Sequence, residues 1–292
     1  MKPIVSLLIP VYNSEDYLRD ALDSVEKQDY ENLEIIILDD GSTDSSPSII
    51  ATYKEKDPRI IVERGENRGI GRGRNRLLSL SSGEFVFFLD SDDILSSSSF
   101  ISRLVLDAEK YESDVVSALT LPFRHKVKRK KDKGVRIYSG REFSYLMTKP
   151  FGFFCYPHSR LIRKSLFSSY SFPENMIFED IPVMPWVIRE SEKVVYDTGA
   201  VYLYRINKKG LSHNRFSSSS LFEMDGYYMN LRKAKEKNDN RISRYSSIFF
   251  LTKYYYYLVK ALVTGFGVKE YQKAYKKKAK EAWHSLFMED YR

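Results

Sequence analysis

Short apolar runs alternate with helix-like patterns through the first 115 residues of the chain. Runs of about four to eight apolar residues are typical of buried strands, and apolar residues three or four positions apart are typical of amphipathic helices. We expect strands at residues 5–10, 34–38, 59–63 and 84–89, and helices at 14–28, at 45–56, from the end of the glycine-rich loop 67–75 to about 81, and at 96–111. This alternation predicts an α/β protein whose mixed, mostly parallel sheet is flanked by helices.

The second half of the chain has weaker periodicity. We expect a strand at residues 114–121, a helix at 181–191, extended chain at 193–204 and helices from residue 217 onward. In this last part, one stripe of a helix consists of Tyr245, Ile248, Phe249, Thr252, Tyr255, Val259 and Leu262, and Lys253 and Lys260 share another face. The final predicted helix separates Val268, Tyr271, Ala282 and Leu286 from Lys269, Lys273, Lys276 and Lys280.

The composition favours a globular protein. Of the 292 residues, 42% are hydrophobic and 29% are charged, which argues against a disordered chain, a coiled coil or a collagen. The single cysteine, Cys155, excludes an intramolecular disulfide and a four-cysteine zinc site, and it fits a reducing compartment. We find no signal-peptide pattern, and the most apolar long segment, residues 248–263, is interrupted by two lysines. We therefore expect a cytoplasmic protein.

The net charge of +8 is concentrated at one end of the chain. Residues 230–292 contain fifteen Lys and Arg against six Asp and Glu, and a second basic run occupies residues 124–133. Such basic helices are either solvated faces or contacts for an anionic surface. Membrane headgroups or an anionic glycan fit better than nucleic acid, because no nucleic-acid-binding motif accompanies the charge. The basic helices thus predict a peripheral position on the inner face of the plasma membrane.

Two acidic clusters follow the ends of two predicted strands. Asp90, Asp92 and Asp93 lie within four residues, and a divalent cation such as Mg²⁺ or Mn²⁺ would relieve their mutual repulsion. A solvated turn that caps a helix is the alternative. Asp39 and Asp40 end another strand, where a carboxylate can accept the imide N–H of a uracil or thymine base, although ordinary turn chemistry explains part of the pattern. Because open α/β sheets bind ligands at such strand ends, both clusters predict a nucleotide site.

A glycine-rich basic segment, NRGIGRGRN, runs from Asn67 to Asn75. Its glycines, among them Gly71, permit close backbone approach, and its arginines, among them Arg74, can offset phosphate charge. The segment is not a Rossmann dinucleotide fingerprint, which would follow the first strand, and it is not a Walker loop, because no Gly-Lys-Ser/Thr follows. We interpret it as a loop near phosphate groups.

Four motifs, in this order, resemble the inverting family 2 glycosyltransferases, which bind nucleotide sugars with the glycosyltransferase-A fold. They are SLLIPVYNSEDYLRDALDSV, IIILDDGSTDSS, ENRGIGRGRN and GEFVFFLDSDD, within about the first 100 residues. The resemblance weakens in the middle of the chain, returns at FED (residues 178–180) and continues faintly at LYRINKKGLSHN. One departure is Gly73, where alanine is usual before Arg-Asn.

The resemblance implies roles for the donor-side residues. The base pocket would consist of Pro10, Tyr12 and Asp40 with Asp39 beside them, and Tyr12 offers a ring face for stacking on a pyrimidine. The segment with Asn67, Gly71 and Arg74 would lie near the donor phosphates. The ribose and the metal ion would be bound by Asp90, Asp92 and Asp93, with Asp92 and Asp93 as the expected metal ligands.

The resemblance also implies roles further along the chain. A loop with Arg205, Ser212 and His213 would close on the diphosphate, with His213 either an additional metal ligand or a surface histidine. The acceptor-side element would fall at His158, Arg160 and Arg163. Asp180 would be the catalytic base.

The chemistry of inverting transfer supports a carboxylate in the role of Asp180. Such a reaction needs a base that takes the proton of the acceptor hydroxyl while its oxygen attacks the anomeric carbon. Glu179 and Asp180 precede the predicted helix at 181–191, whose partial positive N-terminal charge favours ionised carboxylates. Simple N-capping is the alternative role, and Glu179 is the competing base.

These observations predict an inverting glycosyltransferase that moves a sugar from a UDP-sugar to a glycan or lipid-linked acceptor in bacterial cell-surface polysaccharide synthesis, such as cell wall or capsule. We expect a nucleotide-sugar-binding catalytic domain at residues 1–215, with a donor half at 1–115 and an acceptor half at 116–215. A helical extension would occupy residues 216–292. A sugar-phosphate nucleotidyltransferase is a second hypothesis, disfavoured because its glycine-rich loop would follow the first strand. The third is a non-catalytic adaptor of the same fold that binds membranes or polyanions.

Overall fold

The computed structural model describes residues 2–123, 134–149, 152–207, 221–264 and 268–287. Its first half contains β1 (Val5–Val11), α1 (Leu18–Glu26), β2 (Leu33–Asp39), α2 (Ser46–Lys56), β3 (Ile60–Arg64), α3 (Ile70–Leu80), β4 (Phe85–Phe88), β5 (Ile94–Leu95) and α4 (Phe100–Tyr111). The second half contains β6 (Val115–Pro122), β7 (Val135–Tyr138), α5 (Gly140–Thr148), β8 (Arg160–Arg163), a 3₁₀ turn (Lys164–Phe167), α6 (Met184–Arg189), β9 (Val194–Tyr204), α7 (Leu221–Glu236), α8 (Asn240–Thr264) and α9 (Val268–Phe287).

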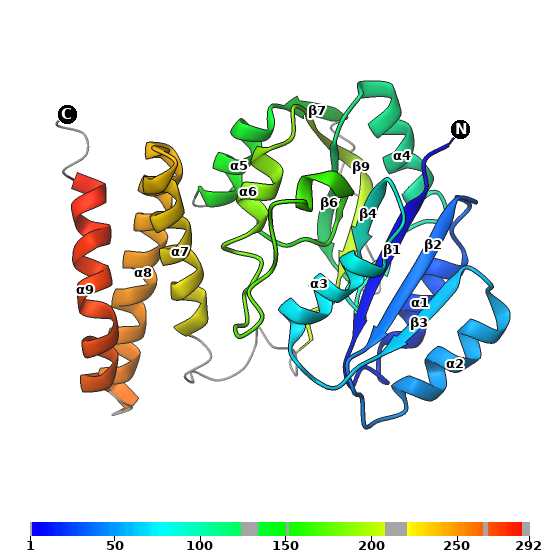
Figure 1. Ribbon diagram of the computed structural model, residues 1–292, viewed down its shortest axis with the longest axis horizontal. Coiled ribbons are helices and arrows are strands. Elements are labelled where there is room, and N and C mark those ends of the chain that lie inside the picture. The colour runs from blue at the N-terminus through cyan, green and yellow to red at the C-terminus, as the bar shows by residue number, and fades with distance from the viewer. Residues whose placement is uncertain (1, 124–133, 150–151, 208–220, 265–267, 288–292) are drawn as a thin grey trace.

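The described strands form one mixed sheet in the order β3-β2-β1-β4-β8-β6-β9-β5, with β7 paired to β9 (Figure 1). β1, β2, β3 and β4 run parallel, and β8 then joins β4 antiparallel. Alternate residues of β1 enter two different cores: Leu7 and Ile9 pack with α1, α2 and α4, whereas Leu8 packs with α3, α5 and α6. The prediction of a mixed sheet between helical layers is confirmed.

Four helix predictions had the wrong bounds. The predicted helices at 14–28 and 96–111 begin later, at Leu18 and Phe100, because hydrogen-bonded turns precede them. The glycine-rich segment is not a loop throughout, since α3 begins within it at Ile70, directly after Gly69 at a φ of 89°. The predicted helix at 181–191 shortens to α6, because residues 180–183 form turns and Pro185, rather than Pro182, occupies its first turn.

The C-terminal helical extension that the sequence predicted is present as α7, α8 and α9, which stand side by side at the end of the molecule far from β3 (Figure 1). The helices share an aromatic-rich core that includes Phe250, Tyr254, Tyr271 and Tyr275. The expected boundary at residues 215/216 lies outside the described residues. Among the described helices, none is long and apolar enough to cross a membrane.

The predicted apolar stripe on α8 faces outward for much of its length. Thr252, Tyr255, Val259 and Leu262, here called the outer stripe, are exposed, with Leu262 at 61%. The core of the three helices instead receives the residues one position away, such as Phe250 and Tyr254. α8 therefore carries apolar side chains on two opposite faces.

Candidate active site

The carboxyl ends of β1, β2 and β4 meet at one edge of the sheet, because these strands are parallel. Val11 of β1 is in register with Asp39 of β2, and the backbone N–H of Asp40 donates to the carbonyl of Val11 at 2.8 Å. Asp90 follows β4 along the same edge. The structure thus brings the two predicted acidic clusters to neighbouring strand ends, as expected for a ligand site of an open α/β sheet.

Asp39 is the buried member of the first acidic pair. One of its oxygens, Oδ1, accepts a hydrogen bond from the Ser42 backbone N–H at 2.9 Å, whereas the buried Oδ2 has no hydrogen-bond partner among the described residues. Asp40 is half-buried, and burial raises the pKa of its carboxyl. Tyr12 is 48% exposed beside this pair, and Pro10 is buried within β1. Asp39 Oδ2 forms an ion pair with Nε of the exposed Arg64 at 3.5 Å, without a hydrogen bond. An exposed ring and a carboxylate oxygen that accepts no hydrogen bond suit a planar base that has an N–H donor.

Asp93 is the most deeply buried carboxylate of the second cluster. The Tyr202 hydroxyl donates to it at 2.7 Å, and the Arg205 backbone N–H donates at 2.8 Å. Burial, together with the charges of Asp90 and Asp92, raises the pKa of Asp93 to about 8. A cation at this position would offset the same repulsion that otherwise favours protonation.

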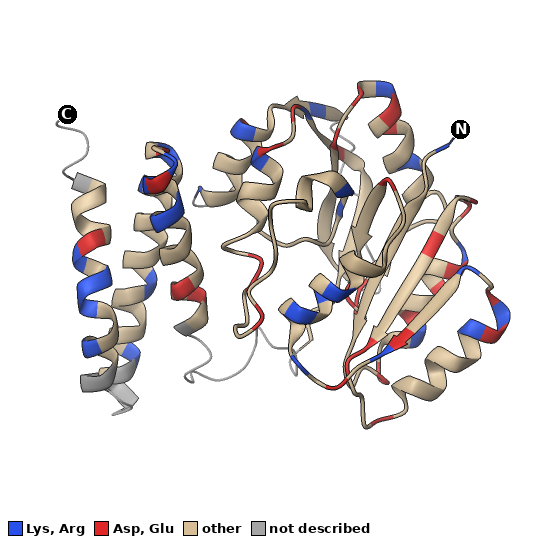
Figure 2. Cartoon of the chain, viewed as in Figure 1, with Lys and Arg blue, Asp and Glu red and all other residues tan. Residues whose placement is uncertain are grey.

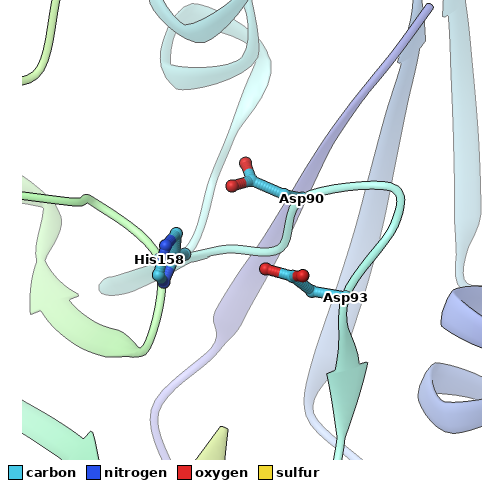
Figure 3. A group of neighbouring side chains, drawn as sticks. All are labelled: Asp90, Asp93 and His158. Carbon is cyan, nitrogen blue, oxygen red and sulfur yellow. The ribbon is translucent and has the colours of Figure 1, made fainter. Parts of the chain in front are cut away.

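Asp90 and Asp93 lie together with His158, a residue that the sequence reasoning did not assign to a metal (Figure 3). One potential ligand atom from each of the three residues lies within 4.8 Å of the others. His158 is buried, its Nδ1 has no hydrogen-bond partner within the described part of the chain, and burial lowers its pKa to about 4, which keeps the imidazole neutral. Two carboxylates and a neutral imidazole fit a divalent ion such as Mn²⁺. Asp92 stays outside this group, and its Oδ2 accepts from Asn207 at 3.1 Å.

Arg74 joins the acidic turn after β4 to the FED motif, which lies far from it in sequence. Its buried guanidinium is 3.3 Å from Asp90 Oδ1 and forms an ion pair with Glu179 of the FED motif. The same group lies over the rings of Phe88 and Phe172 at 6.0 and 5.8 Å. Arg74 therefore fixes Glu179 beside the acidic turn after β4, a contact that its sequence position in a basic segment does not reveal.

Asp180 lies next to this ion pair and is buried. Its Oδ1 accepts from the Ile181 backbone N–H at 2.9 Å. Burial raises the pKa of Asp180 to about 6, while the positive charge of Arg74 acts in the opposite direction. A carboxyl that titrates near neutral pH combines a useful ionised fraction with appreciable basicity, which suits a general base.

The C-terminal extension supports the residues after Asp180, which the sequence analysis did not foresee. Asn230 of α7 donates from Nδ2 to the Ile181 carbonyl at 2.7 Å and accepts from the Trp186 indole N–H at 2.7 Å. A Cβ on Gly226, one turn earlier in α7, would meet the Ile181 Cβ at 3.0 Å. The helical extension and the FED segment are therefore packed into one unit.

Two glycines of the basic segment have different environments. A Cβ on Gly71 would lie 2.0 Å from the Pro173 carbonyl oxygen, so α3 can approach the chain before FED only because this residue is glycine. A Cβ on Gly73 would lie at an ordinary 3.4 Å from Leu38 Cδ2. The space at Gly73 therefore accommodates the alanine that is usual in the family that the motifs resemble.

Other predicted site residues have varied positions. Asn67 is exposed. The side chain of Arg205 donates from Nε to the backbone carbonyl of Asp92 at 2.9 Å. Arg160 donates to the backbone carbonyl of Phe154 at 2.8 Å. This contact joins two residues of the same stretch, 154–160. Ser212 and His213 lie outside the described residues, as does the basic run at 124–133.

Comparisons with known proteins agree with this architecture. GlyA of Streptococcus pneumoniae serotype 4, a glycosyltransferase, is 31% identical over 225 residues, which are 71% of this chain and 31% of GlyA. GgaB of Bacillus subtilis strain 168, a minor teichoic acid biosynthesis protein, is 29% identical over 71% of this chain and 23% of its own length. The chain thus spans less than a third of either relative.

Two solved structures show the same fold. S. aureus TarS 1-349 in complex with UDP-GlcNAc matches with a TM-score of 0.70 and 19% identity, over 97% of this chain and 81% of that chain. The mannosyltransferase PcManGT of Pyrobaculum calidifontis, in complex with GDP-Man and Mn²⁺, matches with a TM-score of 0.61 and 17% identity, over 100% of this chain and 89% of that chain. The glycosyltransferase-A fold that the motifs implied is confirmed.

The family itself is established by the extent of the sequence match. The profile of glycosyl transferase family 2 matches residues 6–171, which is more than half of the chain and includes the strand-end clusters, Arg74 and His158. The chain belongs to glycosyl transferase family 2.

Proposed function

We propose that this protein is an inverting, metal-dependent glycosyltransferase that uses a UDP-sugar. The observation that carries the proposal is Arg74, whose buried guanidinium holds Glu179 of FED against Asp90 of the acidic turn. This contact puts Asp180 beside the cluster expected to hold the donor diphosphate. A nucleotide pocket and a buried base in one site are the two elements that inverting transfer needs.

Each part of the site has a separate task in the proposed reaction. One of the two carboxylates, that of Asp39 or that of Asp40, accepts the imide N–H of uracil, and Tyr12 stacks on the base. Asp90, Asp93 and His158 would hold the divalent ion, which offsets the charge of the diphosphate when bound. Asp180 takes the proton from the acceptor hydroxyl as that oxygen attacks the anomeric carbon, while the bond from this carbon to the diphosphate breaks on the opposite face and UDP leaves. The Glu179–Arg74 ion pair keeps the base in position.

The donor is tested by heating the protein with UDP, GDP, dTDP and CMP sugars in the presence of Mn²⁺. We expect UDP-sugars to raise the melting temperature most, because the two carboxylates at the end of β2 select a base that has an imide N–H. dTDP-sugars carry the same imide group and test recognition of the ribose. A larger stabilisation by a GDP- or CMP-sugar would overturn the assignment of uracil.

The acceptor is proposed to be a glycan or a lipid-linked sugar of the bacterial cell surface, at the cytoplasmic face of the membrane. The teichoic acid relative supports the setting. The single cysteine, Cys155, is free and buried, which fits a reducing compartment. Helices α8 and α9 carry the features that favour a membrane contact.

The outer stripe of α8 points away from α7. Lys253 and Tyr257 of α8 contact Glu223 of α7, at 2.9 and 3.0 Å. Since successive residues turn by about 100° around a helix, the exposed apolar residues lie about 120–180° away from Lys253. The outer stripe is thus on the side of α8 that α7 does not cover.

A lysine-rich face of α9 lies on the same side of the helix pair. Lys278 contacts Asp225 of α7 at 2.7 Å, and Lys273, Lys276 and Lys280 are exposed on the opposite side of α9. Figure 2 shows several basic positions along α9. The side chain of Lys269, the fourth lysine of the predicted basic face, lies outside the described part of the structure. Apolar and aromatic residues beside lysines are typical of helices that lie in the headgroup region of an anionic membrane.

We expect the protein to sediment with vesicles of phosphatidylglycerol and not with those of phosphatidylcholine. Each lysine near such a surface contributes roughly 1 kcal/mol, and salt screens the attraction. Replacing Lys273, Lys276 and Lys280 with glutamate should abolish sedimentation, whereas replacing Lys54 and Lys56 of α2 with glutamate should not. Equal binding to both kinds of vesicle, or to neither, would refute the membrane assignment.

A further inference from the structure

Four aromatic rings form a continuous column between the metal group and the protein surface. In order, the rings belong to Phe154, Tyr156, His158 and Tyr202. Their centroids are separated by 5.1, 4.7 and 4.8 Å, with interplanar angles of 17°, 25° and 7°. The inner end is fixed, because the Tyr202 hydroxyl donates to Asp93. The outer end, Phe154, is 65% exposed.

The outer end of the column is a rigid surface. Buried Arg160 donates to the backbone carbonyls of both Phe154 and Tyr156, so the two residues are held at their main chain. One face of the Phe154 ring is covered by Tyr156, which leaves the other face as the terminus of the stack. An exposed ring that its neighbours already hold in place offers a preformed flat face to a ligand, so little conformational freedom is lost when a ligand stacks on it.

The inner part of the column belongs to the same site as the proposed base. Asp90 of the metal group lies 3.3 Å from Arg74, whose ion pair with Glu179 fixes the FED segment that carries Asp180. His158, two rings below Phe154, lies in the group with Asp90 and Asp93. A molecule stacked on Phe154 is therefore three ring spacings from His158 of the metal group, along the same column.

We propose that Phe154, supported by Tyr156, is an acceptor subsite that stacks against the flat face of a pyranose ring. One face of a pyranose presents several C–H groups, whose partial positive charge complements the negative face of an aromatic ring. This inference rests on the proposed function, in which Asp180 is the base for an acceptor hydroxyl. It adds the class of acceptor: a cyclic sugar residue rather than an open-chain alditol phosphate, which has no such face.

Saturation-transfer NMR of the UDP- and Mn²⁺-loaded protein tests the subsite with four probes. Three are the methyl β-glycosides of glucose, galactose and N-acetylglucosamine, and the fourth is ribitol. We expect at least one glycoside to receive saturation at its ring C–H protons and ribitol to receive much less. Phe154→Ala should weaken glycoside binding by about tenfold, whereas Phe154→Tyr, which keeps the ring, should retain it.

Two controls separate this proposal from the proposed function. Tyr256→Ala removes an exposed ring of α8 that lies outside the outer stripe and should leave glycoside binding unchanged. The stabilisation by UDP and Mn²⁺ is measured for each variant: if it is intact while Phe154→Ala binds glycosides as well as the native chain, the subsite is wrong and the donor site stands. Binding of ribitol with no binding of any glycoside would likewise overturn the subsite. Loss of UDP stabilisation in the native chain would instead overturn the proposed function.

Discussion

Replacing Asp180 with asparagine is expected to lower the rate of sugar transfer by at least about 100-fold, the lower end of the contribution of a general base. The substitution keeps the size of the side chain and an oxygen that can accept from the Ile181 N–H, but it removes the proton acceptor. UDP should still stabilise the variant, because Asp180 is outside the group of Asp90, Asp93 and His158. The measurement is the initial rate of transfer to the true acceptor, since donor hydrolysis by water can use another base.

Two further measurements identify the role of Asp180. Glu179→Gln should cost less than Asp180→Asn, because Glu179 is already engaged by Arg74. The pH profile of the native enzyme should fall below about pH 6, where the raised pKa of Asp180 leaves its carboxyl protonated and unable to accept a proton, and should level off above it. The opposite ranking of the two variants would exchange their roles. Near-native rates for both would exclude FED as the source of the base.

UDP is expected to stabilise the folded protein only when a divalent ion is present. At a UDP concentration one hundred times the dissociation constant, the gain in the free energy of unfolding should be about 2.7 kcal/mol. Without the ion, the diphosphate meets Asp90 and the other carboxylates of the turn, and their repulsion opposes binding. Chemical unfolding with UDP, in Mn²⁺ or in EDTA, measures the difference. A stabilisation of equal size in EDTA would refute the metal assignment.

Substitutions in the acidic turn locate the ion. Asp93→Asn is expected to remove the metal-dependent stabilisation by UDP. Asp93 belongs both to the pair with Asp92 that the motif implies as metal ligands and to the group with Asp90 and His158. Asp92→Asn distinguishes these two assignments. If Asp92→Asn loses the metal-dependent stabilisation by UDP, Asp92 and Asp93 are the metal ligands, as the motif implies. If the variant keeps this stabilisation, the ligands are Asp90, Asp93 and His158. The unfolding transition without UDP confirms that each variant is folded.

The positions of the acidic clusters could be predicted from the sequence because they depend on local order. Each cluster directly follows an apolar strand, and parallel strands bring their carboxyl ends to one edge of the sheet. His158 and Arg74 differ, because their site contacts come from chain packing. His158 reaches the site through a bridge with Phe88, and Arg74 pairs with Glu179, which is 105 positions away. No spacing rule in the sequence predicts either contact.

α8 shows a different limit of sequence analysis. A stripe at helical spacing indicates a helix, but it does not indicate which of two apolar faces is covered. Phe250 and Tyr254 form one such face, and Tyr255 and Val259 form the other. The choice depends on where α7 and α9 pack.

The hydrogen bond from Asn230 to the Ile181 carbonyl has a consequence for building chimaeras of these enzymes. Ile181, whose carbonyl accepts this hydrogen bond, directly follows Asp180. Exchanging the C-terminal helices between relatives would therefore also replace the residue that holds the segment next to the proposed base. Gly226 and Asn230 would have to be transferred together with the segment around Ile181 and Trp186 as one module. The natural point of recombination in this chain is therefore not the join between sheet and helices, although the sequence motifs end near it.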